Sequence, residues 1–188
     1  MSISSETGRS SPTRLTYREY VLFPDDGNRH EIMAGRHYMN PAPNPRHQTV
    51  SRHIQFQLYE QIELKGLGQV FNAPIDLQLS DWDIVQPDLV VVLRENRIIT
   101  PTKIKGIPDL VIEILSSSSR DYDRQLKRQL YEQSAVPEYW IVDPDDQNVR
   151  LFRLQPEGSY APPVIHSRHI SFAAATCVAT VNLSRVWQ

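Results

Sequence analysis

The chain has 188 residues, a formal net charge of −2, and 40% hydrophobic and 22% charged residues, as ordinary globular proteins have. No apolar run approaches the ~20 residues that cross a bilayer, and the first residues lack the apolar core of a secretory signal. The single cysteine excludes an intrachain disulfide and a multi-cysteine zinc site. The sequence predicts a cytoplasmic protein with one domain over residues 13–188, after a disordered, Ser- and Thr-rich tail at residues 1–12.

The N-terminal part predicts a hairpin and one long helix. A short helical or turn segment at 15–23 precedes residues 29–40, which alternate apolar and polar side chains as a β-hairpin does. Three prolines predict an extended loop over 41–47. Apolar residues then recur every three or four positions over 47–62, which indicates an amphipathic helix ending near Gly66.

Three further segments predict the strands of a sheet. Residues 70–79 are expected to form one strand, and the apolar, β-branched runs at 86–93 and 108–115 suit central strands covered on both faces. Ser116–Ser119 are predicted to cap a helix from Arg120 to about Ser134. Two strands joined by a turn follow over 138–154, and edge strands are expected after them. The fold class is therefore α/β (α+β), in one mixed layer structure.

Two basic clusters are candidates for contact with phosphate, since the chain as a whole is near neutral. The alternative is that both are solvated helix faces. They comprise Arg46, Arg52 and His53, and then Arg120, Arg124, Lys127 and Arg128.

Two acids stand out within the apolar runs. Glu113 lies in the middle of the run 111–115, where carboxylates are rarely buried unless they are paired or bind a metal. Asp88 opens the other run. Because two acids at the ends of neighbouring strands repel each other, we expect a hard cation, Mg²⁺ or Mn²⁺, to bind there. The backbone carbonyl of Ile114 is a further predicted ligand. The alternative is that Glu113 pairs with an arginine and that Asp88 merely begins a strand.

A lysine is predicted to face the same site. At about 100° per residue, the apolar stripe of the helix at 120–134 also contains Asp123 and Lys127, which are spaced as an i,i+4 pair. Both are therefore expected to face the sheet. A lysine beside two carboxylates can polarise a scissile phosphate and help orient the attacking water. The alternative is that the Lys127 stem lies along apolar surface while its ammonium group reaches solvent.

These residues carry a family resemblance. Pro87-Asp88 followed by Glu113 is similar to the PD-(D/E)XK nuclease signature. A longer set of segments resembles the Uma-two family of restriction-endonuclease-like proteins, also labelled domain of unknown function 820. That resemblance extends over about residues 14–155, and the segments that carry it are 29–51, 86–92 and 108–144.

The resemblance implies a restriction-endonuclease-like fold, with a mixed β-sheet flanked by helices, and Asp88 and Glu113 as metal ligands. The signature places its lysine two residues after the glutamate, where this chain has Leu115. In the Uma-two pattern, a lysine one helix onward matches Lys127, in agreement with the orientation derived above. Glu31, on the hairpin, matches a position that is typically acidic in the family. It is a candidate third ligand or holder of a metal-bound water, and the alternative is a half-exposed strand glutamate.

Three other polar residues are assigned structural roles. His47 lies on the apolar stripe of the long helix, so we interpret it as a core or capping histidine rather than a catalytic one. Asp76 and Asp143 are interpreted as turn or strand-end residues.

Three functions remain open at this stage. The first is metal-dependent endonucleolytic hydrolysis of DNA, with a homodimer expected because cutting two strands favours two symmetry-related sites. The second is a nuclease-like scaffold that binds nucleic acid or protein without cleaving it. The third is an acid/base hydrolase such as a glycosidase, which also uses two carboxylates but leaves Lys127 without a role. The inward-facing acids and lysine favour the first.

Overall fold

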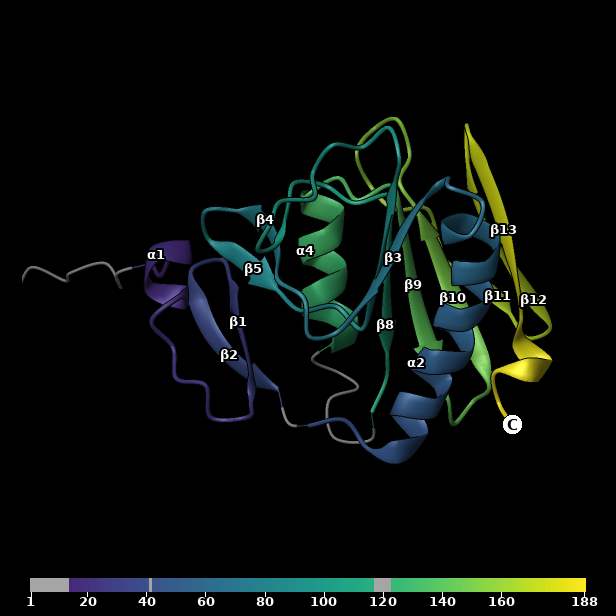
Figure 1. The fold of residues 1–188 in the computed structure, drawn as a ribbon, viewed down its shortest axis with the longest axis horizontal. Helices are drawn as coiled ribbons and strands as arrows, with labels where there is room; N and C mark the ends of the chain where they lie inside the picture. The colour runs from purple at the N-terminus through teal and green to yellow at the C-terminus, as the bar shows by residue number, and fades with distance from the viewer. Residues whose placement is uncertain (1–13, 41, 117–122) are drawn as a thin grey trace, which may run out of the picture.

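A mixed six-stranded β-sheet forms the centre of the fold (Figure 1). The computed structural model describes residues 14–40, 42–116 and 123–188. In the six-stranded sheet β8 and β9 run parallel, and all other neighbours are antiparallel. Its strands, in spatial order, are β11 (Val164–His166), β10 (Asn148–Arg153), β9 (Glu138–Asp143), β8 (Leu110–Ile114), β6 (Leu89–Leu93) and β3 (Gly68–Asn72).

Two smaller sheets accompany it. The N-terminal hairpin belongs to a five-stranded sheet, and the short helix α1 (Tyr17–Tyr20) packs on it. The last two strands pair only with each other among the described residues. The strands of the five-stranded sheet, in spatial order, are β2 (Arg36–Asn40), β1 (Arg29–Met33), β5 (Asp83–Val85), β4 (Leu77–Ser80) and β7 (Ile104–Lys105), and the last pair is β12 (His169–Ala174) and β13 (Cys177–Asn182).

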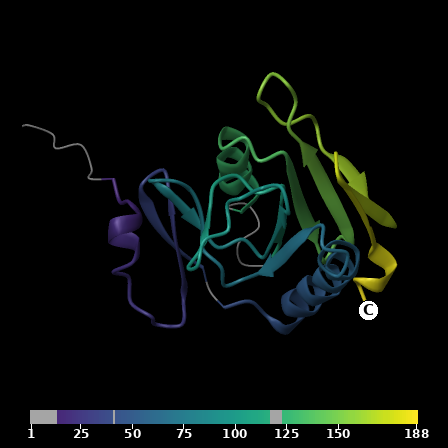
Figure 2. The same cartoon turned by 45° about the horizontal axis from the view of Figure 1, so that its top comes forward.

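The two faces of the central sheet carry separate cores, because successive residues of a strand point to opposite faces. On one face, Ile112 and its neighbours pack against the long helix and the β12–β13 pair. On the other face, Val111 packs against α4 and the five-stranded sheet. Figure 2 shows the long helix beside the C-terminal segment on the outer side. The helices are α2 (Pro45–Leu58), η1 (Tyr59–Glu63), η2 (Asp123–Lys127), α4 (Arg128–Gln133) and η3 (Leu183–Arg185).

Most of the predicted elements are present. The hairpin at 29–40, the helix that ends before Gly66, both central strands and the β9–β10 hairpin are confirmed. None of the helices in the described ranges is long and apolar enough to span a membrane. The predicted tail at 1–12, the caps at 117–119 and the predicted helix start at Arg120 lie outside the described residues.

Two predictions about elements were wrong. The loop at 41–47 ends earlier, because Pro45 occupies the first turn of α2, where a missing N–H costs nothing and the proline φ suits a helix. Residues 70–79 form two strands instead of one, since Pro74 cannot donate to a ladder and the segments on either side pair in different sheets. The predicted C-terminal edge strands are present, since β11 lies at an edge of the central sheet and β12 and β13 form a two-stranded pair in which each strand is an edge.

Candidate active site

The strand register brings the two predicted acids together. The antiparallel pairing of β6 with β8 places Leu89 opposite Ile112. Asp88 comes directly before Leu89 and Glu113 directly after Ile112, so the two acids flank this last pair of the ladder. Both side chains are buried. The backbone N–H of Ile114 also donates to Asp88 Oδ2 at 2.8 Å. The sequence predicted this convergence, and the register supplies its physical cause.

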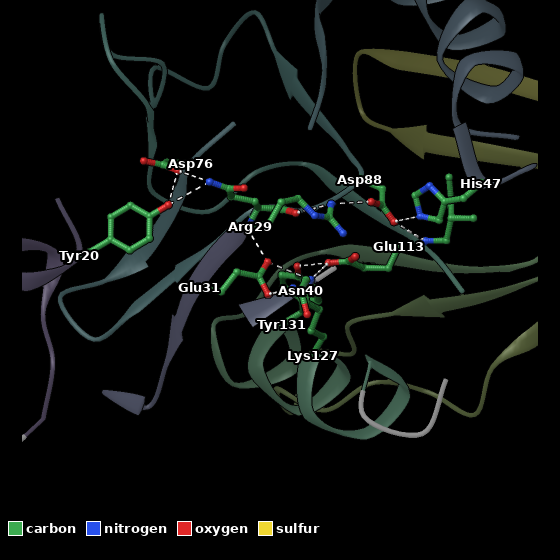
Figure 3. A network of polar contacts seen from close by, with 12 residues as sticks. Tyr20, Arg29, Glu31, Asn40, His47, Asp76, Asp88, Glu113, Lys127 and Tyr131 are labelled. Atoms are coloured by element: carbon green, nitrogen blue, oxygen red, sulfur yellow. Dashed lines mark hydrogen bonds and ion pairs between the residues drawn. The ribbon is translucent and has the colours of Figure 1, made fainter. Parts of the chain in front are cut away.

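Three donors surround the Asp88 carboxylate (Figure 3). Arg29 Nη1 from β1 lies 2.9 Å from Oδ1, and His47 Nε2 from the first turn of α2 lies 2.9 Å from Oδ2, which also accepts the Ile114 N–H. Burial alone would raise the pKa of Asp88. The hydrogen bond and charge of His47, the charge of Arg29 and the Ile114 N–H outweigh burial and lower the pKa to about 2.

This shift predicts that Asp88 stabilises the fold only above acidic pH. The pKa falls from an ordinary 3.8 to about 2 in the folded state, so the contribution is full above pH 4 and is lost as the pH falls towards 2. We expect Asp88→Asn in metal-free buffer to cost about 2 kcal/mol of unfolding free energy at pH 7. Urea unfolding of both proteins between pH 7 and pH 2.5 measures the difference, which should shrink below pH 4.

The control for this prediction is Asp145→Asn, which removes an exposed carboxylate that pairs with Arg46 at 2.7 Å. Exposed pairs contribute less than about 1 kcal/mol, so this variant should differ little from the parent across the range. A cost of Asp88→Asn that stays constant down to pH 2.5 would contradict the prediction.

Lys127 lies between two carboxylates in the interior. Its Nζ is 3.0 Å from Glu31 Oε1 and 2.9 Å from Glu113 Oε1. The lysine is 1% exposed, Glu31 0% and Glu113 3%. The Lys127 ammonium group therefore does not reach solvent, and Glu31 is not a half-exposed strand residue. Because buried charges are costly unless they are paired, the three side chains depend on one another.

The helix that carries Lys127 also carries a second donor to Glu113. Tyr131, one turn later in α4, donates from its hydroxyl group to Glu113 Oε1 at 2.7 Å. Burial and the charge of Glu113 raise the pKa of the Tyr131 phenol well above its ordinary value. The hydroxyl therefore remains protonated and acts as a donor. The side chain of Asp123, the predicted i,i+4 partner of Lys127, lies outside the described residues.

The cluster continues into the five-stranded sheet through Glu31. Its Oε2 accepts from Asn40 Nδ2 at 2.6 Å across the hairpin, and its Oε1 accepts from the backbone N–H of Gln86 at 2.7 Å. The Gln86 side chain in turn donates to Tyr20 and Asp76 at 3.0 Å each (Figure 3). Glu31 thus joins the hairpin, the segment before Asp88 and the Lys127 helix. Asp76, interpreted as a strand-end residue, accepts from Tyr20 at 2.6 Å at the far end of this network.

Several residues of the site were missed by reasoning from sequence. His47 is buried as expected, yet its Nε2 contacts Asp88. Arg29 and Asn40 lie at the two ends of the predicted hairpin, and nothing in their local pattern indicates contact with a carboxylate. Tyr131 was assigned to the apolar stripe, and the hydroxyl group of a buried tyrosine was the available signal, because such groups usually find a partner. Asp143 is a strand-end residue, and its Oδ1 accepts the backbone N–H of Asp145 and Asp146.

The donor chemistry at Asp88 and Glu113 fits a hard divalent cation. Within the described ranges no three His, Cys, Asp or Glu side chains are arranged to hold an ion. Mg²⁺, however, usually keeps several waters and takes only one or two protein carboxylates. From the residues that the structure describes, Asp88 Oδ1 accepts a single hydrogen bond, from Arg29, and a carboxylate oxygen has about two acceptor positions. One position thus remains for a cation, in competition with the Arg29 guanidinium.

Comparisons with known proteins agree with this fold. The sequence model of the Uma2 family, described as "Putative restriction endonuclease", matches residues 17–183. The chain is also similar to a solved structure from Anabaena variabilis, described as "a putative nuclease belonging to DUF820". The TM-score is 0.75 at 17% sequence identity, over 92% of this chain and 97% of that chain. No curated protein matches. The predicted mixed α/β class, with the fold of that neighbour, is confirmed.

Proposed function

The chain belongs to the Uma2 family, described as "Putative restriction endonuclease", and we propose that it is a nuclease that hydrolyses phosphodiester bonds of DNA with the help of Mg²⁺ or Mn²⁺. The site is the one formed by Asp88, Glu113, Lys127 and Glu31. A homodimer is the proposed assembly, because cleavage of two strands favours two sites related by symmetry.

One observation carries the proposal: acids and a lysine are buried together where two neighbouring strands meet. Asp88 and Glu113 flank the Leu89–Ile112 pair at the end of the β6–β8 ladder, and Lys127 contacts Glu113 at 2.9 Å from η2. A fold gains little stability from a buried charge cluster compared with apolar residues of similar volume. Such a cluster in a chain of this family is therefore better explained by chemistry than by stability.

Each residue has a proposed role. Asp88 and Glu113 would hold the metal ion, with the carbonyl of Ile114 as a further ligand. The ion would supply Lewis-acid stabilisation of the phosphodiester and activation of water. Lys127 fixes the Glu113 carboxylate through its 2.9 Å contact. In the proposed reaction its positive charge would stabilise the negative charge that develops on the scissile phosphate. Glu31 orients Lys127 from the hairpin side. His47 and Arg29 orient the Asp88 carboxylate.

One observation favours a silent scaffold as the second candidate. Asp88 already has three protein donors, which stabilise the carboxylate without any cation. A chain that had lost catalysis would keep such a network for structural reasons. This alternative predicts no metal binding at Asp88 and no cleavage.

Metal titration separates the two candidates. Calorimetry with Mg²⁺ and Mn²⁺ on the wild type and on Asp88→Ala should show binding that the substitution abolishes. Supercoiled, linear, branched and single-stranded DNA are then incubated with each protein in the presence of the metal that binds. Cleavage by the wild type and loss of cleavage with Asp88→Ala would support the nuclease. Wild type that binds neither metal and cleaves none of these DNAs would make the mechanism untenable and favour the scaffold, and metal binding without cleavage of any of these DNAs would contradict the proposed substrate.

A further inference from the structure

A basic pocket lies between helix α2 and the C-terminal end of the chain. It has a volume of about 310 Å³, and both Figure 1 and Figure 2 show the C-terminal end of the chain beside α2. Three of its side chains are Arg or His and none is acidic. The pocket is lined by Arg52, His53, Phe56, Gln57, Arg185 and Gln188.

The two arginines of this pocket carry positive charge that no residue in the described part of the chain neutralises. Arg52 and Arg185 are both exposed, and neither forms an ion pair with any residue that the structure describes. The chain as a whole has a net charge of −2, so this concentration of positive charge is local. Phe56, 53% exposed, adds an uncovered aromatic ring to the same pocket. Cationic side chains beside an exposed ring suit a sugar–phosphate chain with its bases.

The walls of the pocket are held in place by hydrogen bonds between α2 and the C-terminal segment. His53 Nδ1 lies 3.2 Å from the carbonyl oxygen of Val186. Gln57 accepts the backbone N–H of Asn182 at 2.8 Å and donates to its carbonyl oxygen at 3.3 Å. The spacing of Arg52 and Arg185 is therefore set before any ligand arrives, which lowers the entropic cost of binding.

The pocket lies on the helix that also reaches the candidate active site. His47, in the first turn of α2, contacts Asp88, and Arg52 follows five residues later. At 1.5 Å of rise and 100° per residue, Arg52 lies about 7.5 Å further along the helix axis and about 140° around it from His47. The pocket and the candidate active site therefore lie on different sides of the same helix, and a DNA strand that contacts both has to pass around α2.

We propose that the pocket of Arg52 and Arg185 binds the phosphate backbone of the DNA strand that leaves the active site. This inference rests on the proposed function for its substrate and adds the path that the substrate takes. Arg52 and Arg185 neutralise phosphates of this strand beyond the site of cleavage, and Phe56 contacts the adjoining sugar or base. This local positive charge gives one face of the protein affinity for DNA, although the chain as a whole is near neutral.

Fluorescence anisotropy with a labelled 30-base-pair DNA duplex tests the proposal. EDTA is included so that the full-length protein binds without cutting. We expect R52A/R185A to weaken binding about tenfold at 100 mM salt. The slope of log K against log salt should become shallower by about 1.8, because each phosphate contact contributes about 0.9. R52K/R185K retains the charges and should keep the wild-type slope. Both arginines are exposed, so thermal unfolding is expected to be unchanged.

The matched control is R94A/R97A, which also removes two exposed arginines. Arg94 and Arg97 follow the C-terminal end of β6, whereas Asp88 precedes its N-terminal end, so Arg94 lies about 20 Å from Asp88 at 3.3 Å per residue. Affinity within twofold of the wild type is expected for this pair. Equal losses in both double variants would show unspecific attraction and overturn the proposal, as would wild-type affinity in R52A/R185A.

Two further outcomes separate this inference from the proposed function. If the wild type binds no DNA at any salt concentration, both the proposed nuclease function and the proposed DNA-binding pocket are contradicted. Wild type that binds DNA while R52A/R185A binds equally well would remove only the pocket. A labelled polyglutamate peptide is the second probe. If it binds the wild type as tightly as DNA does, and R52A/R185A no longer binds it, the pocket is assigned to an acidic protein partner and the proposal is overturned.

Discussion

Replacing Lys127 by methionine is expected to lower the free energy of unfolding by about 3–5 kcal/mol. The substitution keeps the volume of the stem but leaves Glu31 and Glu113 buried without their shared cation. Removing one partner of a buried charge pair is costly because the remaining charge has lost its solvent and its counter-ion. Urea unfolding at pH 7 measures the loss. Cleavage should be abolished as well.

The control for Lys127→Met is Arg128→Met, one residue further along the same helix. The Arg128 side chain is 36% exposed and lies 3.5 Å from Glu132, so its loss should cost less than about 1 kcal/mol. The double variant K127M/E113Q also removes one of the two carboxylates that Lys127→Met leaves without a counter-ion, so it should recover part of the lost unfolding free energy. Additive losses in this double-mutant cycle would show that Lys127 and Glu113 do not interact, contrary to their 2.9 Å contact.

The sequence predicted the neighbourhood of Lys127 better than its bonding. Apolar periodicity placed the lysine on the inward face of its helix, and the structure buries it there. The assumed 100° per residue does not hold throughout, since residues 123–127 form a π-helical turn. Lys127 is buried nevertheless, because Leu130 and Tyr131 of α4, which follows directly, pack in the core and hold the helix against the sheet. Whether Lys127 acts on a phosphate remains a prediction.

Contacts between distant segments could not be predicted from local pattern. Strand polarity and apolar runs indicated that Asp88 and Glu113 approach each other, since each run is a short central strand. Glu31 lies 96 residues from Lys127 in sequence, and their ion pair depends on how the hairpin sheet packs on the central sheet. Alternation within the hairpin gave no information on that packing. The same reason explains why Arg29 and His47 were not predicted to contact Asp88.

Glu113→Gln is expected to reduce DNA cleavage by about 10³-fold. The amide keeps the shape of the side chain and an oxygen that can accept from Tyr131, but it lacks the charge that would hold a divalent cation. Loss of about 4 kcal/mol of transition-state stabilisation, within the range that metal ions supply, corresponds to that factor. Initial rates of plasmid nicking with Mg²⁺ and with Mn²⁺ measure it. DNA affinity in EDTA should stay within about twofold of the wild type.

Glu138→Gln is the matched control for this variant, because Glu138 is an equally buried strand glutamate at the opposite end of the β8–β9 pair. There it accepts from Arg153 and Trp140. If each buried carboxylate mattered only for the stability of the fold, Glu113→Gln and Glu138→Gln would reduce cleavage by similar factors. If the charge at Glu113 serves chemistry, only Glu113→Gln loses the rate at a temperature where both variants are folded. Full cleavage by Glu113→Gln would remove this carboxylate from the mechanism and leave Asp88 without its proposed partner.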